Sequence, residues 1–253
     1  SEFLATSPEF ALKKILSKVP MNLFSLSHAF RDDPYSPYHR RAFLMLEFYR
    51  LGSVEELLSD LKKIMESIKG ESIDFTYRST DEIFLEFCGF SWKDYLTKES
   101  LYEKIKTDFK EIPLPSFNDV SWDDCFFLLF LNIIEPQLAK YPYLILHRYP
   151  ASMKSLSVID PKDSLVCRRF ELYLDGIEVG NCFVEETDSS FIRETFHREM
   201  KLKKEIYNYE LPTAQEFLAC IQSDLPSSVG IAIGVERLLQ ILLKTQTVPG
   251  TFW

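Results

Sequence analysis

The sequence predicts an α+β fold in which helices flank a mainly antiparallel sheet. Three observations support this fold class: strand-like segments lie near both ends of the chain, a helical stretch separates them, and a two-residue turn signal joins two of the later strands. Strands grouped before and after a run of helices are typical of α+β domains. We therefore expect the whole chain, residues 1–253, to form one such domain.

The first third predicts a short helix followed by two strands. Residues 8–19 have helical periodicity, with the apolar stripe Phe10, Leu12, Ile15 and Leu16. Strands are expected over residues 22–31 and 43–49, and the polar stretch between them contains two prolines. These two strands predict an antiparallel hairpin with a long tip.

The middle of the chain predicts helices. Ser53 and Glu56 have the spacing of a capping box, and the apolar residues that follow recur at helical spacing. Several helices with polar joints are expected from residue 72 to residue 140, ending in an apolar helix over residues 123–139. We expect residues 51–140 to be a helical insertion within the domain.

The last third returns to strands. Residues 143–147, 169–174 and 177–183 predict strands, and Asp175-Gly176 between the last two is a hairpin signal. Helices are expected over 189–206 and 213–222. A strand over 229–235 then leads directly into a helix over 236–243.

The composition excludes several classes of protein. The chain has 38 acidic and 29 basic side chains, a net charge of -9, which disfavours broad binding to nucleic acid. Five widely spaced cysteines without metal-ligand spacing indicate reduced thiols in a cytoplasmic protein. The most apolar run, residues 125–134, is about half the ~20 residues of a membrane span, so no membrane association is expected.

The strand over residues 43–49 contains a carboxylate among aromatic side chains. Alternation places Phe43, Met45, Glu47 and Tyr49 on one face. A carboxylate on a largely apolar face is costly to desolvate unless a cation meets it. That cation is either an amine ligand or one of the protein's own Lys or Arg side chains.

Three further glutamates punctuate the strands near the Asp175-Gly176 turn: Glu171, Glu178 and Glu185. Clustered carboxylates suit Mg²⁺ or an ammonium group, and the alternative is an exposed acidic face. Glu178 and Asn181 have opposite strand parity, so they share a pocket only if the chain bulges, and Gly180 is the natural position for a bulge.

The segment from Val229 to Leu239 combines a glycine-punctuated strand with a helix start. Glycines at such a junction allow a ligand to approach the backbone, and Arg237 in the first helical turn suits phosphate oxygens. The alternative is simple packing of the helix on the sheet. The occurrence of this segment together with the two acidic strands favours a ligand site.

Four ordered segments resemble a known enzyme class. Phe30-Arg31-Asp32-Asp33 with His39 and the strand through Glu47 and Tyr49 resembles motif 2 of class II aminoacyl-tRNA synthetases, and Gly230 to Leu238 resembles motif 3. Residues 6–10 and 176–185 are similar to the lysine-specific branch. Motif 1 is not recognisable, and we expect the N-terminal start of this domain to be missing.

Within that branch the sequence is similar to the EF-P lysine ligase family, which has the catalytic domain without an anticodon-binding domain. The similar features are Tyr149-Pro150-Ala151-Ser152 and an alanine, Ala232, between the motif 3 glycines. The resemblance implies activation of lysine or β-lysine with ATP and Mg²⁺, transfer to elongation factor P, and a homodimer. It disfavours tRNA as a partner. A lysyl-tRNA synthetase fragment and a non-catalytic, synthetase-like binding protein are the alternatives.

The resemblance also implies roles for individual residues. Arg31 and Arg237 would be catalytic, and Glu171 and Glu178 would bind Mg²⁺. The ATP site would comprise Arg31, Asp33, His39, Arg40, Phe43, Glu178, Val179, Gly234 and Arg237. The lysine pocket would comprise Ser7, Glu9, Glu47, Tyr49, Asn181 and Glu185.

Overall fold

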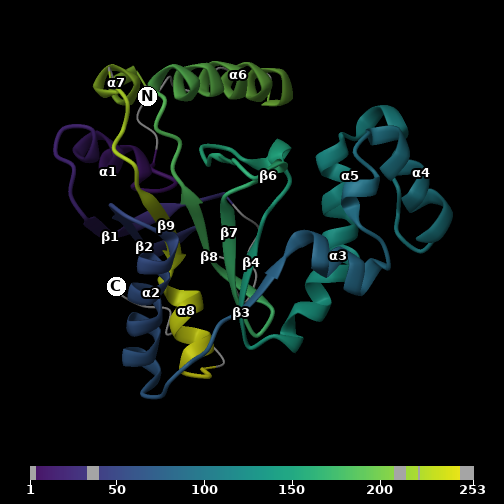
Figure 1. The fold of residues 1–253 in the computed structure, drawn as a ribbon, viewed down its shortest axis with the longest axis horizontal. Helices are drawn as coiled ribbons and strands as arrows, with labels where there is room; N and C mark the ends of the chain where they lie inside the picture. Colours follow the sequence, from purple (N-terminus) through teal and green to yellow (C-terminus); the bar gives the residue numbers. More distant parts are fainter. Residues whose placement is uncertain (1–3, 33–39, 208–214, 222, 246–253) are drawn as a thin grey trace. The chain divides into compact units, whose positions relative to one another are not determined.

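The computed structural model describes residues 4–32, 40–207, 215–221 and 223–245. The chain forms two compact units (Figure 1). Unit 1 comprises residues 1–73, 155–158 and 179–253, and unit 2 comprises residues 74–154 and 159–178. The strand β8, Ile177–Val184, begins in unit 2 and ends in unit 1.

Unit 1 contains antiparallel strands in the order β1, β2, β9 and β8. Their bounds are Leu23–Phe30 for β1, Ala42–Arg50 for β2 and Val229–Gly234 for β9, with β8 contributing residues from Val179 onward. The predicted hairpin of β1 and β2 is confirmed. The pairing of β8 with β9 runs in regular register from Gly180 to Val184, so the bulge predicted at Gly180 is absent from it.

The helices of unit 1 are α1 (Glu9–Leu16), α2 (Val54–Lys69), α6 (Ser189–Tyr207), α7 (Gln215–Cys220) and α8 (Val235–Leu242). The predicted capping box of α2 is confirmed, because the Ser53 hydroxyl accepts from the Glu56 amide and the Glu56 carboxylate accepts from the Ser53 amide. Gly70 ends this helix in the left-handed conformation, with φ of 79°.

Helix α1 corrects the stripe predicted from its sequence. Leu12 and Leu16 are buried and pack with Tyr49, but Phe10 and Ile15 are 41% and 49% exposed. Lys13 is buried instead. The helix begins at Glu9 and turns its Leu12, Lys13 and Leu16 face toward the strands, so a lysine, a residue type that is usually exposed, is buried at the edge of the apolar stripe.

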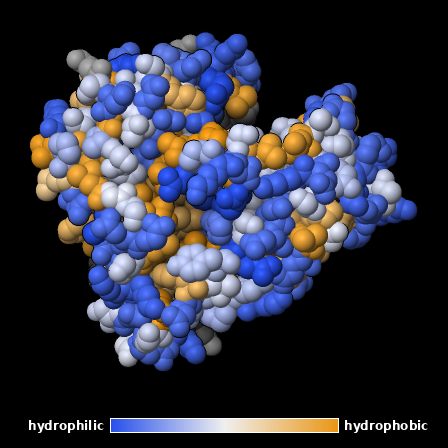
Figure 2. Space-filling view, in the orientation of Figure 1, coloured by the Kyte–Doolittle hydropathy of each residue, from blue (hydrophilic) through white to orange (hydrophobic). Residues whose placement is uncertain are grey.

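The alternation predicted for β2 is confirmed, since Met45, Glu47 and Tyr49 are buried at every second position. On the side of unit 1 formed by α1 and β1, hydrophobic residues gather at the surface (Figure 2). Phe24 and Leu26 of β1 are also exposed, by 73% and 58%. Exposed apolar patches of this kind are often covered by a protein partner, and the predicted homodimer stays a prediction.

Unit 2 combines strands with short helices. Its strands are β3 (Thr76–Ser79), β4 (Tyr143–His147), β5 (Ile159–Asp160), β6 (Asp163–Cys167) and β7 (Arg169–Leu174). Its α-helices are α3 (Thr80–Cys88), α4 (Lys98–Asp108) and α5 (Trp122–Leu129), with short 3₁₀ turns at Trp92–Asp94, Phe117–Asp119 and Ala151–Met153. A large aromatic core that includes Phe84, Trp92 and Phe126 holds these helices together.

The long helix predicted over residues 123–139 is three pieces. The α-helix α5 ends at Leu129, a π-helical segment follows over Phe130–Ile134, and a 3₁₀ helix covers Glu135–Lys140. Pro136 is the physical reason, because proline lacks the amide hydrogen that an α-helix would donate to the carbonyl four residues earlier.

Three strands of unit 2 were not predicted. β3 pairs in parallel with β4, and β5 pairs with β6 in a small separate sheet. β3 is four residues long and ends at Ser79, the first residue of the capping box with Glu82. The sequence pattern therefore indicates only the helix that follows. Strand pairing in unit 2 is therefore mixed, with β4 and β7 antiparallel.

The predicted turn at Asp175-Gly176 is confirmed. Both residues have positive φ, 47° and 82°, as a two-residue type I′ turn requires. A Cβ on Gly176 would lie 2.7 Å from the backbone nitrogen of Ala139, so the position excludes larger residues. No helix among the described residues is long and apolar enough to span a bilayer.

Candidate active site

Three adjacent strands of unit 1 place two residues of the predicted lysine pocket, Glu47 and Asn181, in one row. Glu47 of β2 lies opposite Ala232 of β9, and Ala232 lies opposite Asn181 of β8. Residues directly opposite in antiparallel strands share a face, so these three side chains stand in one row. Two positions along, Tyr49 lies opposite Gly230. The small residues of β9 therefore leave room between the polar side chains of β2 and β8.

Helix α1 brings two charged residues to this face. The Lys13 ammonium donates to Glu9 Oε1 at 2.7 Å and lies 2.7 Å from Glu185 Oε2. The side chains of Lys13 and Glu185 are both 2% exposed. Glu9 and Lys13 are four residues apart and therefore lie on the same side of the helix. One ammonium thus joins the start of α1 to the chain just beyond β8.

The backbone holds Glu185 at this position. Its amide donates to the carbonyl of Ser228 at 3.0 Å, and a β-bridge pairs it with Ser157. A Cβ on Gly230 would lie 2.7 Å from Glu185 Oε1 and 2.5 Å from the Tyr49 ring. Only glycine at position 230 therefore lets the carboxylate and the ring approach each other.

Glu47 and Glu185 each have a buried oxygen without a hydrogen bond among the described residues, but Glu185 Oε2 lies 2.7 Å from the Lys13 ammonium, whereas Glu47 has no such ion pair. The Tyr49 hydroxyl donates to Glu47 Oε1 at 2.8 Å, whereas Glu47 Oε2 is buried and no described residue forms a hydrogen bond with it. Within the described part of the chain no Lys or Arg forms an ion pair with Glu47. The sequence allowed an ion pair between Glu47 and a Lys or Arg of the protein. The structure instead has ion pairs between Lys13 and the two neighbouring glutamates, Glu9 and Glu185.

The electrostatics of the cluster favour a cation. Burial, with repulsion from Glu9, raises the pKa of Glu47 to about 7, and burial raises the pKa of Glu185 to about 7 against the attraction of Lys13. Burial opposes the charge on Lys13, but attraction to Glu185 and Glu9 outweighs it and raises the pKa of Lys13. A further ammonium would return Glu47 to its ionised form.

Two of the residues predicted to bind ATP meet at the start of β2. The Arg31 guanidinium lies 5.5 Å from the centre of the Phe43 ring, and the Arg31 amide donates to the carbonyl of Arg41 at 2.9 Å. The hairpin register explains the approach, because β1 ends and β2 begins at this point.

The junction of β9 and α8 lies beside the same strand. Met45 pairs with Gly234, and the amide of Leu44 donates to Glu236 Oε1 at 2.8 Å, which ties the first turn of α8 to β2. Arg237 is in that turn. Arg31 thus follows β1, Phe43 lies on β2, Gly234 ends β9 and Arg237 lies in the first turn of α8, and their assignment to one nucleotide site stays a prediction.

The remaining predicted residues of these two sets have varied positions. Asp33 and His39 lie outside the described residues. Arg40 is exposed, Val179 is buried, and the Ser7 hydroxyl accepts from the Glu9 amide at 3.4 Å as α1 begins.

The predicted metal ligand Glu171 lies in unit 2 within a second buried cluster. The Arg169 guanidinium ion-pairs with Glu171 Oε1, and the hydroxyls of Tyr149 and Tyr173 both donate to Oε2. Arg169 also lies 4.7 Å from the centre of the Tyr149 ring. Both oxygens of this carboxylate are therefore already hydrogen-bonded within the protein.

Glu178 is close to this second cluster, because its charge contributes to raising the pKa of both Tyr149 and Tyr173, which burial raises most. Among the described residues, no three His, Cys, Asp or Glu side chains converge as a complete metal site. Mg²⁺ commonly takes only one or two carboxylates from a protein and completes its shell with substrate phosphates and water. The two carboxylates, Glu171 and Glu178, fit that chemistry. Glu171 would then bind Arg169 and Mg²⁺ at the same time.

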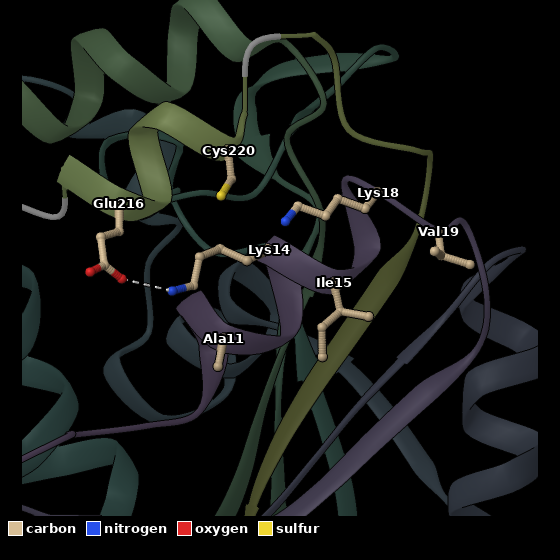
Figure 3. A pocket seen from close by; sticks show the side chains of 7 residues that line it. All are labelled: Ala11, Lys14, Ile15, Lys18, Val19, Glu216 and Cys220. Carbon is tan, nitrogen blue, oxygen red and sulfur yellow. Dashed lines mark hydrogen bonds and ion pairs between the residues drawn. The ribbon is translucent and has the colours of Figure 1, made fainter.

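The outer side of α1 is different in character. A cavity of about 560 Å³ lies between α1 and α7 and contains none of the predicted site residues. Lys14, next to Lys13 in the chain, points to Glu216 of α7 and forms a 3.2 Å ion pair there (Figure 3). The two consecutive lysines, Lys13 and Lys14, therefore form ion pairs on different sides of α1.

Lys13 is the residue that sequence reasoning missed. Its signal was available, since it lies four residues after Glu9 and between Leu12 and Leu16 of the buried stripe. The partner Glu185 could not be found from sequence spacing, because strand pairing alone brings it to α1.

Comparison with known proteins identifies the family. Residues 2–251 match the family described as tRNA synthetases class II (D, K and N). Proteins named elongation factor P–(R)-β-lysine ligase are similar over almost the whole chain. The relative from Proteus mirabilis is 28% identical, with 97% of this chain and 75% of the relative covered. The relative from Sodalis glossinidius is 30% identical, with 96% and 74% covered.

The chain therefore belongs to the class II synthetase family, in the branch of the EF-P lysine ligases. Membership confirms the predicted α+β class II fold and makes the protein an ATP-dependent ligase. A third relative in this branch, from Buchnera aphidicola subsp. Schizaphis graminum, is 30% identical, with 97% of this chain and 75% of the relative covered.

Proposed function

We propose that this class II ligase activates lysine or β-lysine with ATP, forming an aminoacyl-adenylate, and transfers the aminoacyl group to a lysine side chain of elongation factor P. The names of the relatives support the acceptor and the type of substrate. The binding of a cationic substrate is supported independently by the cluster around Glu47.

One observation carries the proposal: the buried oxygen Oε2 of Glu47 has no hydrogen-bond partner among the described residues. A buried carboxylate oxygen without a donor is costly. A substrate ammonium supplies both the missing donor and the missing positive charge. Tyr49, which donates to the other oxygen, would fix the carboxylate toward that ammonium.

The first chemical step joins two anions. A carboxylate oxygen of the amino acid attacks the α-phosphorus of ATP, the bond to the β-phosphate oxygen breaks, and pyrophosphate leaves. In this proposal Arg31 holds the α-phosphate and Arg237 the γ-phosphate, so that fixed positive charge meets the negative charge that grows in the transition state. The Phe43 ring would stack on adenine, opposite the Arg237 side chain.

The second step needs no covalent intermediate with the enzyme. The uncharged amine of the acceptor lysine attacks the carbonyl carbon of the adenylate, the bond to the phosphate oxygen breaks, and AMP leaves. The acceptor nitrogen loses a proton and an amide remains. A tRNA hydroxyl as acceptor would give an ester instead.

Glu171 and Glu178 are the residues we propose to hold Mg²⁺. The ion would neutralise phosphate charge when bound with the nucleotide. The protein's part is to present the two carboxylates, and Tyr149 and Tyr173 fix the orientation of Glu171 through their hydrogen bonds to Oε2.

Pyrophosphate exchange tests the activation step. The protein, ATP, Mg²⁺ and labelled pyrophosphate are incubated with lysine, (R)-β-lysine or each other amino acid in turn. We expect label to enter ATP only with lysine or β-lysine. A protein that exchanges nothing would contradict the proposal and favour a binding protein without catalytic activity.

The acceptor is tested separately with labelled amino acid. Label is expected on elongation factor P, where replacement of its modified lysine by arginine should abolish it. Label on tRNA instead, released by mild base as an ester, would contradict the proposed acceptor and favour a lysyl-tRNA synthetase.

A further inference from the structure

Lys13 is a buried lysine to which the proposed reaction assigns no role. Its side chain is 2% exposed, and its two ion-pair partners, Glu9 and Glu185, are both members of the proposed lysine pocket. Its neighbour Lys14 is 32% exposed and pairs with Glu216 at the surface. The contrast indicates that Lys13 contributes more than solubility or helix stability.

We infer that Lys13 is a positioning residue of the proposed pocket, whose ammonium joins Glu9 of α1 to Glu185 beyond β8 and leaves Glu47 to receive the substrate ammonium. This inference rests on the proposed function. It assigns two different roles to the pocket glutamates. Glu9 and Glu185 bind the Lys13 ammonium, and Glu47 binds the substrate ammonium.

The geometry supports this division. Glu9 and Glu185 come from segments far apart in the sequence, and Lys13 lies 2.7 Å from an oxygen of each. Glu47 forms its hydrogen bond with Tyr49 on its own strand, and its Oε2 has no partner in the part of the chain that the structure describes. The Lys13 ammonium is also 6.0 Å from the centre of the Tyr49 ring, so it borders the cluster without reaching Glu47.

The groups that shift the pKa of Glu47 come from α1, from β2 itself and from the chain beyond β8, whereas the directly paired residues of β1 and β9, Ser25 and Ala232, carry no charge. The groups that shift it belong to Glu9 and Lys13 of α1, Tyr49 of β2 and Glu185 beyond β8. Burial and the two glutamates favour protonation of Glu47, whereas the Tyr49 hydrogen bond and the Lys13 charge favour the carboxylate. Without the Lys13 charge, Glu47 would ionise at higher pH, and an ammonium ligand would bind more weakly at neutral pH.

The test compares three variants with the wild type. Lys13→Met removes the charge but keeps an unbranched apolar chain, and Lys13→Arg keeps the charge but alters its shape. Lys14→Met makes the same chemical change at the adjacent exposed position and is the matched control. For each, KM for lysine, KM for ATP and kcat are measured by pyrophosphate exchange from pH 6 to pH 9.

We expect Lys13→Met to raise KM for lysine about tenfold, the loss of one hydrogen-bonded charge, with KM for ATP within about twofold of wild type. KM for lysine should decrease with rising pH as Glu47 ionises, and in Lys13→Met this decrease should occur at higher pH than in the wild type. Lys13→Arg should raise KM for lysine while keeping the wild-type pH profile, because the charge remains. Lys14→Met should match the wild type.

Two results would overturn the inference. One is a Lys13→Met enzyme with unchanged KM for lysine and unchanged pH profile. The other is an equal increase of both KM values, which would indicate a general structural defect. If Lys13→Met does not fold, Lys13→Arg decides: an increase in KM for lysine alone supports the inference, and a wild-type KM contradicts it.

Failure of the proposed function has a different outcome. A folded wild-type protein without lysine-dependent exchange would remove the proposed function, and the inference would fall with it. A wild type that exchanges, together with a Lys13→Met variant that behaves identically, would remove the inference alone.

Discussion

Two buried glutamate clusters of this protein are made from the same kinds of side chain but differ in completeness. In unit 2, Glu171 accepts from Arg169, Tyr149 and Tyr173, so both oxygens have donors. In unit 1, Glu47 accepts from Tyr49 on one oxygen and has no described donor on the other. A single unsatisfied oxygen among the described residues therefore distinguishes Glu47 from Glu171, whose charge is already balanced by Arg169.

The difference arises from how near the cation lies. Arg169 precedes Glu171 by two positions on β7, so both point to the same face and meet directly. Lys13 comes from a helix and forms ion pairs with Glu9 and Glu185. The same Glu-x-Tyr pattern therefore has different partners in the two strands, because an arginine lies two positions before the glutamate in β7, whereas Met45 has that position in β2.

The largest expected effect is on the complete cluster. Arg169→Ala should lower the free energy of unfolding by about 3–5 kcal/mol, because it leaves the buried Glu171 carboxylate without its cation. Urea unfolding measures the change. Arg148→Ala is the matched control in unit 2, since the ion pairs of Arg148 with Asp160 and Asp163 are more exposed and should contribute about 0–1 kcal/mol. Equal losses in the two variants would refute the contrast.

The open cluster should respond in substrate binding rather than in stability. Glu47→Gln is expected to raise KM for lysine about 10- to 100-fold and to leave KM for ATP unchanged, because only the carboxylate that meets the ammonium is lost. Steady-state pyrophosphate exchange provides both constants. Glu86→Gln, at an exposed ion-pair network in unit 2, serves as the control and should alter neither constant. Unchanged kinetics of Glu47→Gln would exclude Glu47 from the pocket.

The sequence predicted the open cluster in part. Strand alternation correctly placed Glu47 and Tyr49 on a buried face, and the turn at Asp175-Gly176 followed from residue type alone. The ion pair between Arg169 and Glu171 also joins residues that are close in the sequence. The sequence alone, however, does not show whether Glu171 binds this arginine or a ligand. Lys13 was missed because a lysine is usually exposed, whereas the pairing of β8 with β9 brings Glu185 to it.

A third prediction concerns the pH dependence of stability in the ligand-free protein. The pKa values of Glu47 and Glu185 are raised from 4.5 to about 7, so the folded state binds more protons than the unfolded state between these values. These groups therefore reduce stability as pH rises from about 4.5 to 7. The difference in Tm between Glu47→Gln and the wild type should therefore be more favourable to the variant at pH 8 than at pH 5. The expected change is a few degrees, on the order of ~1 kcal/mol.

Glu86→Gln supplies the opposite sign for comparison. Hydrogen bonds from Lys140 and Tyr141 lower the pKa of Glu86, so its contribution to stability is present above pH 4.5 and is lost as pH falls. Its replacement should therefore lower Tm about equally at pH 8 and pH 5, and less at pH 3, where the carboxylate is protonated in both states. Parallel pH curves for wild type and Glu47→Gln would contradict the assignment of Glu47 as an uncompensated carboxylate.

The smallest expected effects come from removing one hydroxyl from each cluster. Tyr173→Phe should lower the free energy of unfolding by about 1 kcal/mol, because Glu171 Oε2 keeps the hydrogen bond from Tyr149.

Tyr49→Phe removes the hydrogen bond of Glu47 Oε1, so both oxygens of that buried carboxylate would then lack a donor in the ligand-free protein. Because this hydrogen bond favours the ionised form, its loss raises the pKa of Glu47 and should raise KM for lysine at pH 7 by about tenfold. Urea unfolding and pyrophosphate exchange on both variants separate the two effects. If Tyr173→Phe changed KM for lysine as much as Tyr49→Phe did, the distinction between a complete and an open cluster would be wrong.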